Sequence, residues 1–173
     1  MSREFAPRVA AAGAVVIDNS SAWRKDPDVP LVVSEVNPED AENPPKGIIA
    51  NPNCTTMAAM PVLKPLHDAA GLQRLIVATY QAVSGSGAKG IAALRDQTRA
   101  IGDPSALALS GQLDTVADPA PYLAPIAFNV LPDWNDPDAD GASAEERALD
   151  AQLAQVLGLP AARVATTLLR VPT

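Results

Sequence analysis

The chain has 173 residues, which is enough for one domain or for parts of two. Apolar residues make up 47% and charged residues 19%, so a packed core is expected and intrinsic disorder is excluded. The 20 Asp and Glu residues outnumber the 13 Lys and Arg residues, and the net charge of -7, without a Lys/Arg-rich patch, argues against a nucleic-acid partner.

Cysteine content and apolar runs bear on the compartment. The one cysteine excludes an internal disulfide and fits a reducing environment. No run approaches the ~20 apolar residues that a membrane helix needs. The first seven residues contain an acid and a proline in place of the apolar segment of a secretory signal. We therefore expect a soluble, cytoplasmic protein with no membrane partner.

The first fifty residues predict short strands joined by polar loops. Residues 8–13 are typical of the end of a helix, and the uninterrupted apolar run 15–17 predicts a parallel strand covered on both faces. Further short strands are predicted at 31–33 and 47–50. The segment 37–46, rich in proline and acids, is predicted to be a surface loop.

In the middle of the chain, helical and strand patterns alternate. A helix is predicted from Cys54 to about Ala70 and ended by Gly71, because apolar residues recur every three positions. The strongest strand of the chain is predicted within residues 72–83. A Gly-Ser-Gly turn then leads into a second helix that runs to about Ile101.

The last third of the chain continues the alternation. Residues 102–124 give an ambiguous pattern, residues 126–131 predict a strand and residues 132–141 an exposed loop. A helix with acids in its first turn is predicted from about residue 143 to Gly158, followed by a last strand at 164–171. This alternation predicts the α/β or α+β class.

Cys54 is the residue most suited to chemistry. It lies in the sequence Asn-Pro-Asn-Cys-Thr-Thr, between a predicted strand and a predicted helix. Pro52 fixes the approach and Asn53 is a good N-cap, so the sulfur would lie at the positive end of a helix, where a thiolate is favoured. An exposed thiolate held there suits acyl-thioester chemistry. The alternative from residue type alone is a small, buried apolar side chain.

The segment around Cys54, residues 51–56, closely resembles the nucleophile motif of aspartate-semialdehyde dehydrogenases. Further segments match that family in the same order, and the resemblance weakens at about 103–120 and 133–157. The matching segments are residues 2–7, 18–24, 26–33, 35–37, 81–85, 126–130 and 170–172.

The resemblance implies a fold and a reaction. Residues 1–52 would be the C-terminal part of an NADP-binding Rossmann-like domain with a parallel sheet. Residues 53–173 would form an incomplete catalytic and dimerisation domain with a mixed sheet, in a homodimer. Cys54 would attack the aldehyde of aspartate 4-semialdehyde, hydride would pass to NADP, and phosphate would release aspartyl 4-phosphate. In lysine, threonine and methionine biosynthesis the sequence of steps runs in reverse.

Family roles carry over to several polar residues. Gln81 matches the residue that positions the substrate beside the thiol. Ser84 and Gly85 match the turn that touches the nicotinamide half of NADP. Arg24 matches the arginine on the phosphate side, and Arg170 matches the arginine that holds the substrate's carboxylate. The alternative for each is an ordinary structural or surface residue.

Two further assignments complete the predicted site. Asn53, beside the nucleophile, is counted with the substrate-binding residues. Asn19, Ser20 and Ser21 form a polar loop after a predicted strand, at the sheet edge where ligands bind in α/β proteins, and are assigned to the cofactor. No metal site is expected.

The sequence departs from the family pattern at its two ends. The family's acid/base is a histidine a few residues beyond the Arg-x-Pro segment, whereas this sequence ends at Thr173. The one histidine of this sequence, His67, would lie about 20 Å along the helix from Cys54. That distance is too great for His67 to replace the family's acid/base histidine. No Gly-x-Gly-x-x-Gly pattern precedes Cys54. We therefore expect little or no turnover by this chain alone.

A third departure lies in the last predicted helix. The family usually carries a lysine near the phosphate, two residues past an acidic pair. After the acidic pair Glu145-Glu146 this position is Ala148, and Arg147 is one position away, on a different face of the helix.

Two alternatives remain. Other acyl-phosphate reductases, such as N-acetyl-glutamyl-phosphate reductases and glyceraldehyde-phosphate dehydrogenases, use the same cysteine chemistry, but they surround the cysteine differently and lack the segment 81–85. The alternative from another class is a non-catalytic, truncated homologue that only dimerises or docks on an intact subunit.

Overall fold

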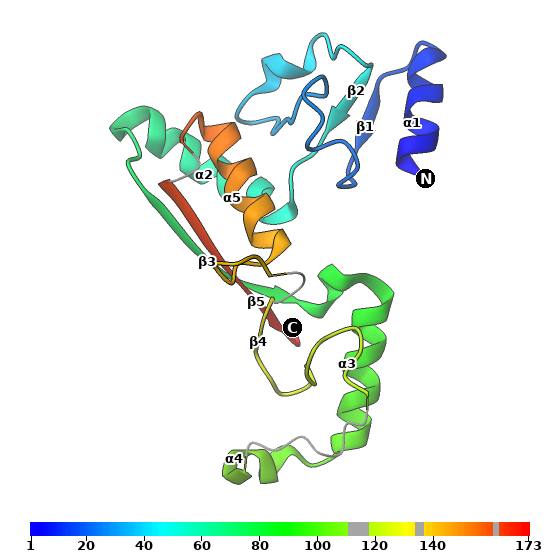
Figure 1. Cartoon of the computed structure of the whole chain (residues 1–173), viewed down its shortest axis with the longest axis vertical. Coiled ribbons are helices and arrows are strands. Elements are labelled where there is room, and N and C mark those ends of the chain that lie inside the picture. Colours follow the sequence, from blue (N-terminus) through cyan, green and yellow to red (C-terminus); the bar gives the residue numbers. More distant parts are fainter. Residues whose placement is uncertain (111–117, 134–136, 161–162) are drawn as a thin grey trace. The chain divides into compact units, whose positions relative to one another are not determined.

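The computed structural model describes residues 1–110, 118–133, 137–160 and 163–173 (Figure 1). It divides into two compact units. The first unit comprises residues 1–76 with 148–165, and the second comprises residues 77–147 with 166–173. The domain boundary between residues 52 and 53 stays a prediction.

The first unit begins with a helix and a pair of parallel strands. Helix α1 (Ser2–Ala11) precedes β1 (Val16–Asp18), which pairs in parallel with β2 (Ile48–Ala50). The strand expected at 31–33 is wrong except for a single bridge from Leu31 to Ala50. The loop expected at 37–46 is confirmed, with one 3-10 turn, η1 (Pro38–Ala41), inside it.

A small apolar core holds this part together. Its buried members are Ala6, Val29, Leu31, Ile48 and Ala50. The prediction that β1 is covered on both faces is wrong, because Val15 beside it and Ile17 within it are 59% and 70% exposed. Among the described residues of this unit, the core covers only the face that carries Val16.

Helix α2 (Cys54–Ala70) has the bounds that the sequence predicts, because both of its ends are capped locally. The Asn53 side chain accepts a hydrogen bond from the Thr55 N–H at the first end, and Gly71 closes the other end in the left-handed conformation. The Nδ1 atom of His67 accepts a hydrogen bond from the Leu72 N–H at 3.1 Å. The His67 side chain therefore helps to close the C-terminal end of α2.

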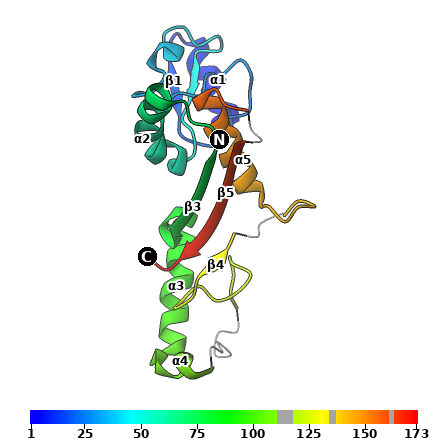
Figure 2. The ribbon, with the colours of Figure 1, turned by 90° about the vertical axis from the view of Figure 1, so that its left-hand side faces the viewer.

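The sheet of the second unit joins three strands in the order β3-β5-β4. The bounds from residue 75 onward are β3 (Leu75–Ala82), η2 (Val83–Ser86), α3 (Gly87–Ile101), η3 (Pro104–Ala106), α4 (Leu107–Ser110), β4 (Leu131–Pro132), α5 (Ala144–Leu157) and β5 (Val164–Val171). Strands β3 and β5 run side by side in the same direction, and β4 pairs antiparallel to β5 (Figure 1, Figure 2). A parallel pair followed by a mixed sheet confirms the predicted fold class.

The strand predicted at 126–131 is wrong except for its last residue. The Oε1 atom of buried Gln97 accepts hydrogen bonds from the Ile126 N–H at 2.8 Å and the Ala127 N–H at 3.1 Å. The Asn129 side chain accepts the Val130 N–H. Because side chains take the N–H groups that a strand would offer to a neighbour, this apolar segment folds as a loop. Residues 134–136 of the loop expected at 132–141 lie outside the described residues.

The start of α5 is a reciprocal cap that also holds the sheet. Ser143 Oγ accepts the Glu146 N–H, and the Glu146 carboxylate accepts the Ser143 N–H at 2.8 Å. The second oxygen of the same carboxylate accepts the Leu168 N–H of β5, also at 2.8 Å. All three residues are buried, so each bond replaces one that water would otherwise provide. None of the helices in the described residues is long and apolar enough to span a bilayer.

Replacing Glu146 by alanine is expected to lower the free energy of unfolding by about 2–4 kcal/mol, because two buried N–H groups lose a charged acceptor. Urea denaturation followed by circular dichroism measures the change. Gln155→Ala, at an exposed position of the same helix, is the control and should alter stability by less than ~0.5 kcal/mol. Equal stabilities of the two variants would contradict the role of Glu146.

Candidate active site

Cys54 is the first residue of α2, and its side chain is exposed. Its sulfur lies 3.5 Å from Asn53 Oδ1, which also accepts the Thr55 N–H at 2.8 Å. The Asn53 N–H in turn donates to the side chain of Gln152 on α5 at 2.6 Å. The predicted N-cap is confirmed, and the exposure of the thiol contradicts the alternative of a buried apolar side chain.

Arg24 lies at the edge where the two parallel strands of the first unit end. Its Nε donates to the carbonyl oxygen of Asn51, directly after β2, at 2.7 Å. Its Nη2 donates to the carbonyl oxygen of Asn19, directly after β1, at 3.2 Å. Within the described residues, Nη1 has no hydrogen-bond partner. The Arg24 guanidinium thus has two fixed nitrogens and one open nitrogen, an arrangement that suits an oxyanion at this edge. The carbonyl that fixes Nε belongs to Asn51, three residues before Cys54 along the chain.

The loop 19–21 is tied to the sheet by Asp18. Ser20 Oγ donates to one Asp18 oxygen at 2.7 Å and accepts the Ala22 N–H at 3.2 Å. Ser2 Oγ donates to the other Asp18 oxygen at 2.7 Å. The Ser20 hydroxyl thus shapes the loop, whereas the Ser21 side chain is exposed. The assignment of Asn19, Ser20 and Ser21 to the cofactor stays a prediction.

The second unit carries the other predicted residues. Gln81 is partly buried near the end of β3, and the exposed Ser84 and Gly85 lie in the turn η2 that follows. Arg170 on β5 is buried, and its Nη2 donates to Glu145 Oε2 at 2.7 Å. Arg170 and Gly85 are close together, because a Cβ placed on Gly85 would lie 3.3 Å from Arg170 Nη1.

Glu145 is a residue of this site that the sequence analysis missed. In the sequence, the acidic pair indicates the first turn of a helix and marks the family's lysine position, and neither indicates a partner for Glu145. One signal was present, since the reciprocal cap of α5 needs a glutamate three residues after Ser143 and therefore uses only Glu146. Its neighbour Glu145 is left for another partner, which proves to be Arg170.

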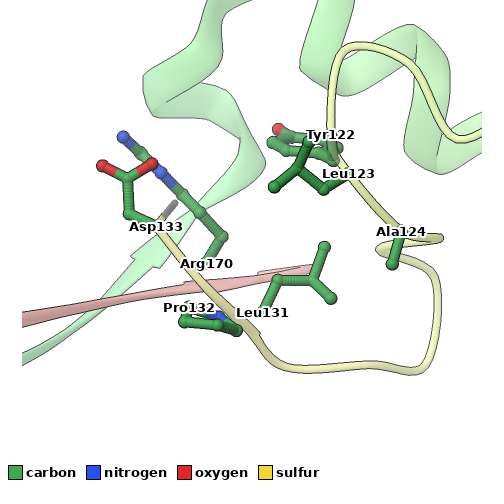
Figure 3. Close-up of a pocket in the computed structure, with 7 residues that line it drawn as sticks. All are labelled: Tyr122, Leu123, Ala124, Leu131, Pro132, Asp133 and Arg170. Carbon is green, nitrogen blue, oxygen red and sulfur yellow. The ribbon is translucent and has the colours of Figure 1, made fainter. Parts of the chain in front are cut away.

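Arg170 also lines a cavity of ≈ 220 Å³ in the second unit (Figure 3). The Arg170 side chain extends along one side of it towards Asp133. Most of the wall is apolar; the lining residues are Tyr122, Leu123, Ala124, Leu131, Pro132, Asp133 and Arg170.

Arg147 is the basic residue nearest to the family's lysine position, and its side chain is held by the acidic loop that contains Asp138 and Asp140. It pairs with Asp138 and, at 3.2 Å, with Asp140. The hydrogen bond from Arg147 lowers the pKa of Asp138 below its ordinary value. Arg147 therefore contacts the acidic loop after β4. Among the described residues, no group of His, Cys, Asp and Glu side chains is arranged to hold a metal ion.

Comparison with known proteins gives a consistent result. Residues 63–173 match the family described as semialdehyde dehydrogenase, dimerisation domain, and residues 1–43 match semialdehyde dehydrogenase, NAD binding domain. The chain is 56% identical to the aspartate-semialdehyde dehydrogenase of Corynebacterium glutamicum, over 99% of this chain and 51% of that protein. The corresponding enzyme of Aquifex aeolicus is 46% identical, over 99% and 48%. The chain spans about half the length of the curated relatives it matches.

Solved structures agree. The aspartate semialdehyde dehydrogenase II of Vibrio cholerae matches with a TM-score of 0.83 at 42% identity, over 99% of this chain and 49% of that chain. The structure of the Vibrio cholerae enzyme complexed with ASA matches with a TM-score of 0.84 at 40% identity, over 99% and 48%.

Cys54 is expected to react with iodoacetamide at neutral pH faster than glutathione does, because its sulfur is exposed and held at the N-terminus of α2. Asn53→Ala should slow the reaction about two- to fivefold, since the helix loses its cap. Val62→Ala, at an exposed position of α2, is the control and should leave the rate unchanged. Intact-mass spectrometry over time measures the rates. A wild-type rate no higher than that of glutathione would contradict the prediction.

Proposed function

Because the chain belongs to the semialdehyde dehydrogenase family, we propose that it is the part of an aspartate-semialdehyde dehydrogenase that carries the nucleophile. The observation that carries the proposal is the exposed Cys54 at the capped start of α2. The identity to aspartate-semialdehyde dehydrogenases and the ASA complex of the Vibrio cholerae enzyme support aspartate 4-semialdehyde as the substrate. The reaction belongs to lysine, threonine and methionine biosynthesis, and the single unpaired cysteine fits the cytoplasm.

In the proposed reaction the Cys54 sulfur forms a bond to the aldehyde carbon, the carbon–oxygen π bond breaks, and the oxygen takes a proton from solvent to give a thiohemiacetal. NADP, when bound, would supply the acceptor for a hydride. Loss of the hydride from the carbon, and of the hydroxyl proton to solvent, leaves a thioester on Cys54. An oxygen of phosphate then attacks the thioester carbon, the carbon–sulfur bond breaks, and the thiolate is restored as aspartyl 4-phosphate leaves.

Each of the two arginines binds a different charged group of the substrates. Arg24 has one guanidinium nitrogen, Nη1, open for a phosphate oxygen. Arg170 with Glu145 presents one positive and one negative group, which matches the α-carboxylate and α-ammonium of an amino acid. The Gln81 amide, which can donate and accept at once, orients the carbonyl oxygen.

The turn after β3 fits the nicotinamide end of NADP. Ser84 and Gly85 are exposed, so the backbone of the turn is accessible. Helix α3 begins at Gly87, and the side chain of its N-cap residue, Ser86, makes no capping hydrogen bond. The first N–H groups of α3 are therefore not engaged by that side chain and can donate to polar groups of a ligand.

A second copy of the chain is the proposed protein partner. The family match for residues 63–173 is a dimerisation domain. Within it, β3 exposes Ala78 and Tyr80, with Tyr80 69% exposed, and the neighbouring strand β5 exposes Thr167. A large aromatic side chain at the edge strand of a sheet is favourable when another chain covers it.

We expect no sustained turnover by the chain alone, but a single half-reaction at Cys54. Without phosphate, the purified chain incubated with L-aspartate 4-semialdehyde and NADP is expected to gain at most one aspartyl group on Cys54 and to reduce an equal amount of NADP. Intact-mass spectrometry and absorbance at the NADPH band measure the two products. Cys54→Ala should give neither. If Cys54 is alkylated readily by iodoacetamide but gains no aspartyl group, the non-catalytic alternative is favoured and the proposed activity fails for this chain.

Light scattering after size-exclusion chromatography measures the mass in solution and so tests the proposed dimer. The wild-type chain is expected to have about twice its mass of 17.9 kDa. Tyr80→Lys should give the monomer mass, because a charge would be buried without a partner, and Tyr80→Phe should keep the dimer. A monomeric wild type, or a dimer that survives Tyr80→Lys, would contradict this interface.

A further inference from the structure

We propose that Gly85 is a positioning residue for Arg170, whose guanidinium occupies the space that a side chain at position 85 would take. This inference deepens the proposed function and rests on it for the identity of the substrate. It gives Gly85 a role in holding the substrate's carboxylate, in addition to the cofactor contact that its place in the family motif implies.

The close contact is the first observation. A Cβ added to Gly85 would lie 3.3 Å from Arg170 Nη1, a separation at which one of the two groups has to move by a few tenths of an ångström. Arg170 is only 9% exposed, so little open space surrounds its guanidinium. Even the smallest side chain at position 85 would therefore displace the nitrogen that faces the turn.

Arg170 cannot yield to such a side chain without loss of other contacts. Its backbone is fixed in β5, where it pairs with Leu131 of β4. Its other terminal nitrogen, Nη2, is held by Glu145 at 2.7 Å. Glu145 is fixed in turn, because the adjacent Glu146 is bonded to the Leu168 N–H of the same strand. A shift of the guanidinium would therefore lengthen the ion pair with Glu145.

Backbone conformation gives no reason for glycine at this position. Gly87, two residues later, has a φ of +71° that disfavours other residues, but Gly85 is not among the glycines with positive φ. Alanine at position 85 would thus be acceptable to the backbone of the turn. The space beside Arg170 is the feature that requires glycine there.

Gly85→Ala separates a substrate role from a cofactor role. L-aspartate, which shares the α-amino and α-carboxylate groups of the substrate, is titrated into the full chain while NMR follows the Arg170 side-chain Nε–H resonance. NADP is titrated separately. We expect Gly85→Ala to weaken L-aspartate binding about tenfold, as for one lost charge-assisted hydrogen bond, and to leave NADP binding unchanged. Weakening of NADP binding alone would overturn the proposal.

Two matched variants complete the experiment. Ser86→Ala alters the next residue of the same turn without adding atoms beside Arg170, and it should leave the L-aspartate titration unchanged. Arg170→Lys removes the nitrogen that a Cβ at position 85 would meet. Adding Gly85→Ala to Arg170→Lys should therefore weaken L-aspartate binding no further. A full tenfold additional loss in that background would overturn the proposal.

The ligand-free spectra keep this test separate from the proposed function. If the wild-type chain binds no L-aspartate, the proposed substrate fails. Gly85 is then judged without ligand: Gly85→Ala should move the Arg170 Nε–H and the Glu145 carboxyl resonances, whereas Ser86→Ala should move neither. Resonances that stay in place in Gly85→Ala would overturn the positioning role.

Discussion

Two adjacent glutamates at the start of α5 hold β5 in place, and much of the second unit depends on them. Glu146 bonds to the Leu168 N–H with its side chain, and its carbonyl oxygen accepts a hydrogen bond from Thr166 Oγ1 at 3.2 Å. Glu145 reaches Arg170. Residues 166, 168 and 170 point to the same side of the strand, because side chains alternate along it. The Ser143–Glu146 cap and the Glu145–Arg170 ion pair thus belong to the same contact between the start of α5 and β5. A shift in the cap would change the geometry around Arg170.

Helices and strands whose ends are determined by adjacent residues could be predicted from the sequence. Helix α2 is one, because its cap Asn53 and its stop Gly71 lie next to it. Strand β5 is another, because a run rich in β-branched and apolar residues ends at the proline after Val171. The segment 126–131 could not be predicted in this way. Its apolar residues favour a strand, but the Gln97 side chain, 29 residues away from Ile126, takes its N–H groups.

The same distinction holds for the site. The position of Cys54 at a helix start follows from four consecutive residues, and the structure confirms it. Gln152 contacts the Asn53 N–H from 99 residues away, and Glu145 contacts Arg170 from 25 residues away. Such partners are set by how helices and strands pack, and no local spacing indicates them. The exposed face of β1 could not be predicted for a similar reason. An apolar run indicates that burial of the strand is favourable, but it does not indicate which other segments cover each face.

Arg24 in the first unit and Arg170 in the second differ in how they are held, and this difference fits the ligand proposed for each. Within the described residues, Arg24 is fixed by two neutral carbonyl oxygens, so its positive charge is oriented without being neutralised. Arg170 is fixed by the Glu145 carboxylate, so the pair is neutral overall. A phosphate carries a net negative charge and is attracted by the first arrangement. An amino acid carries one charge of each sign and is matched by the second, provided that the guanidinium keeps one edge turned to the ligand while the carboxylate holds the other. Because Gly85 has no Cβ, Arg170 Nη1 can keep the position that a side chain there would disturb, and this connects the glycine to the recognition of a charged group.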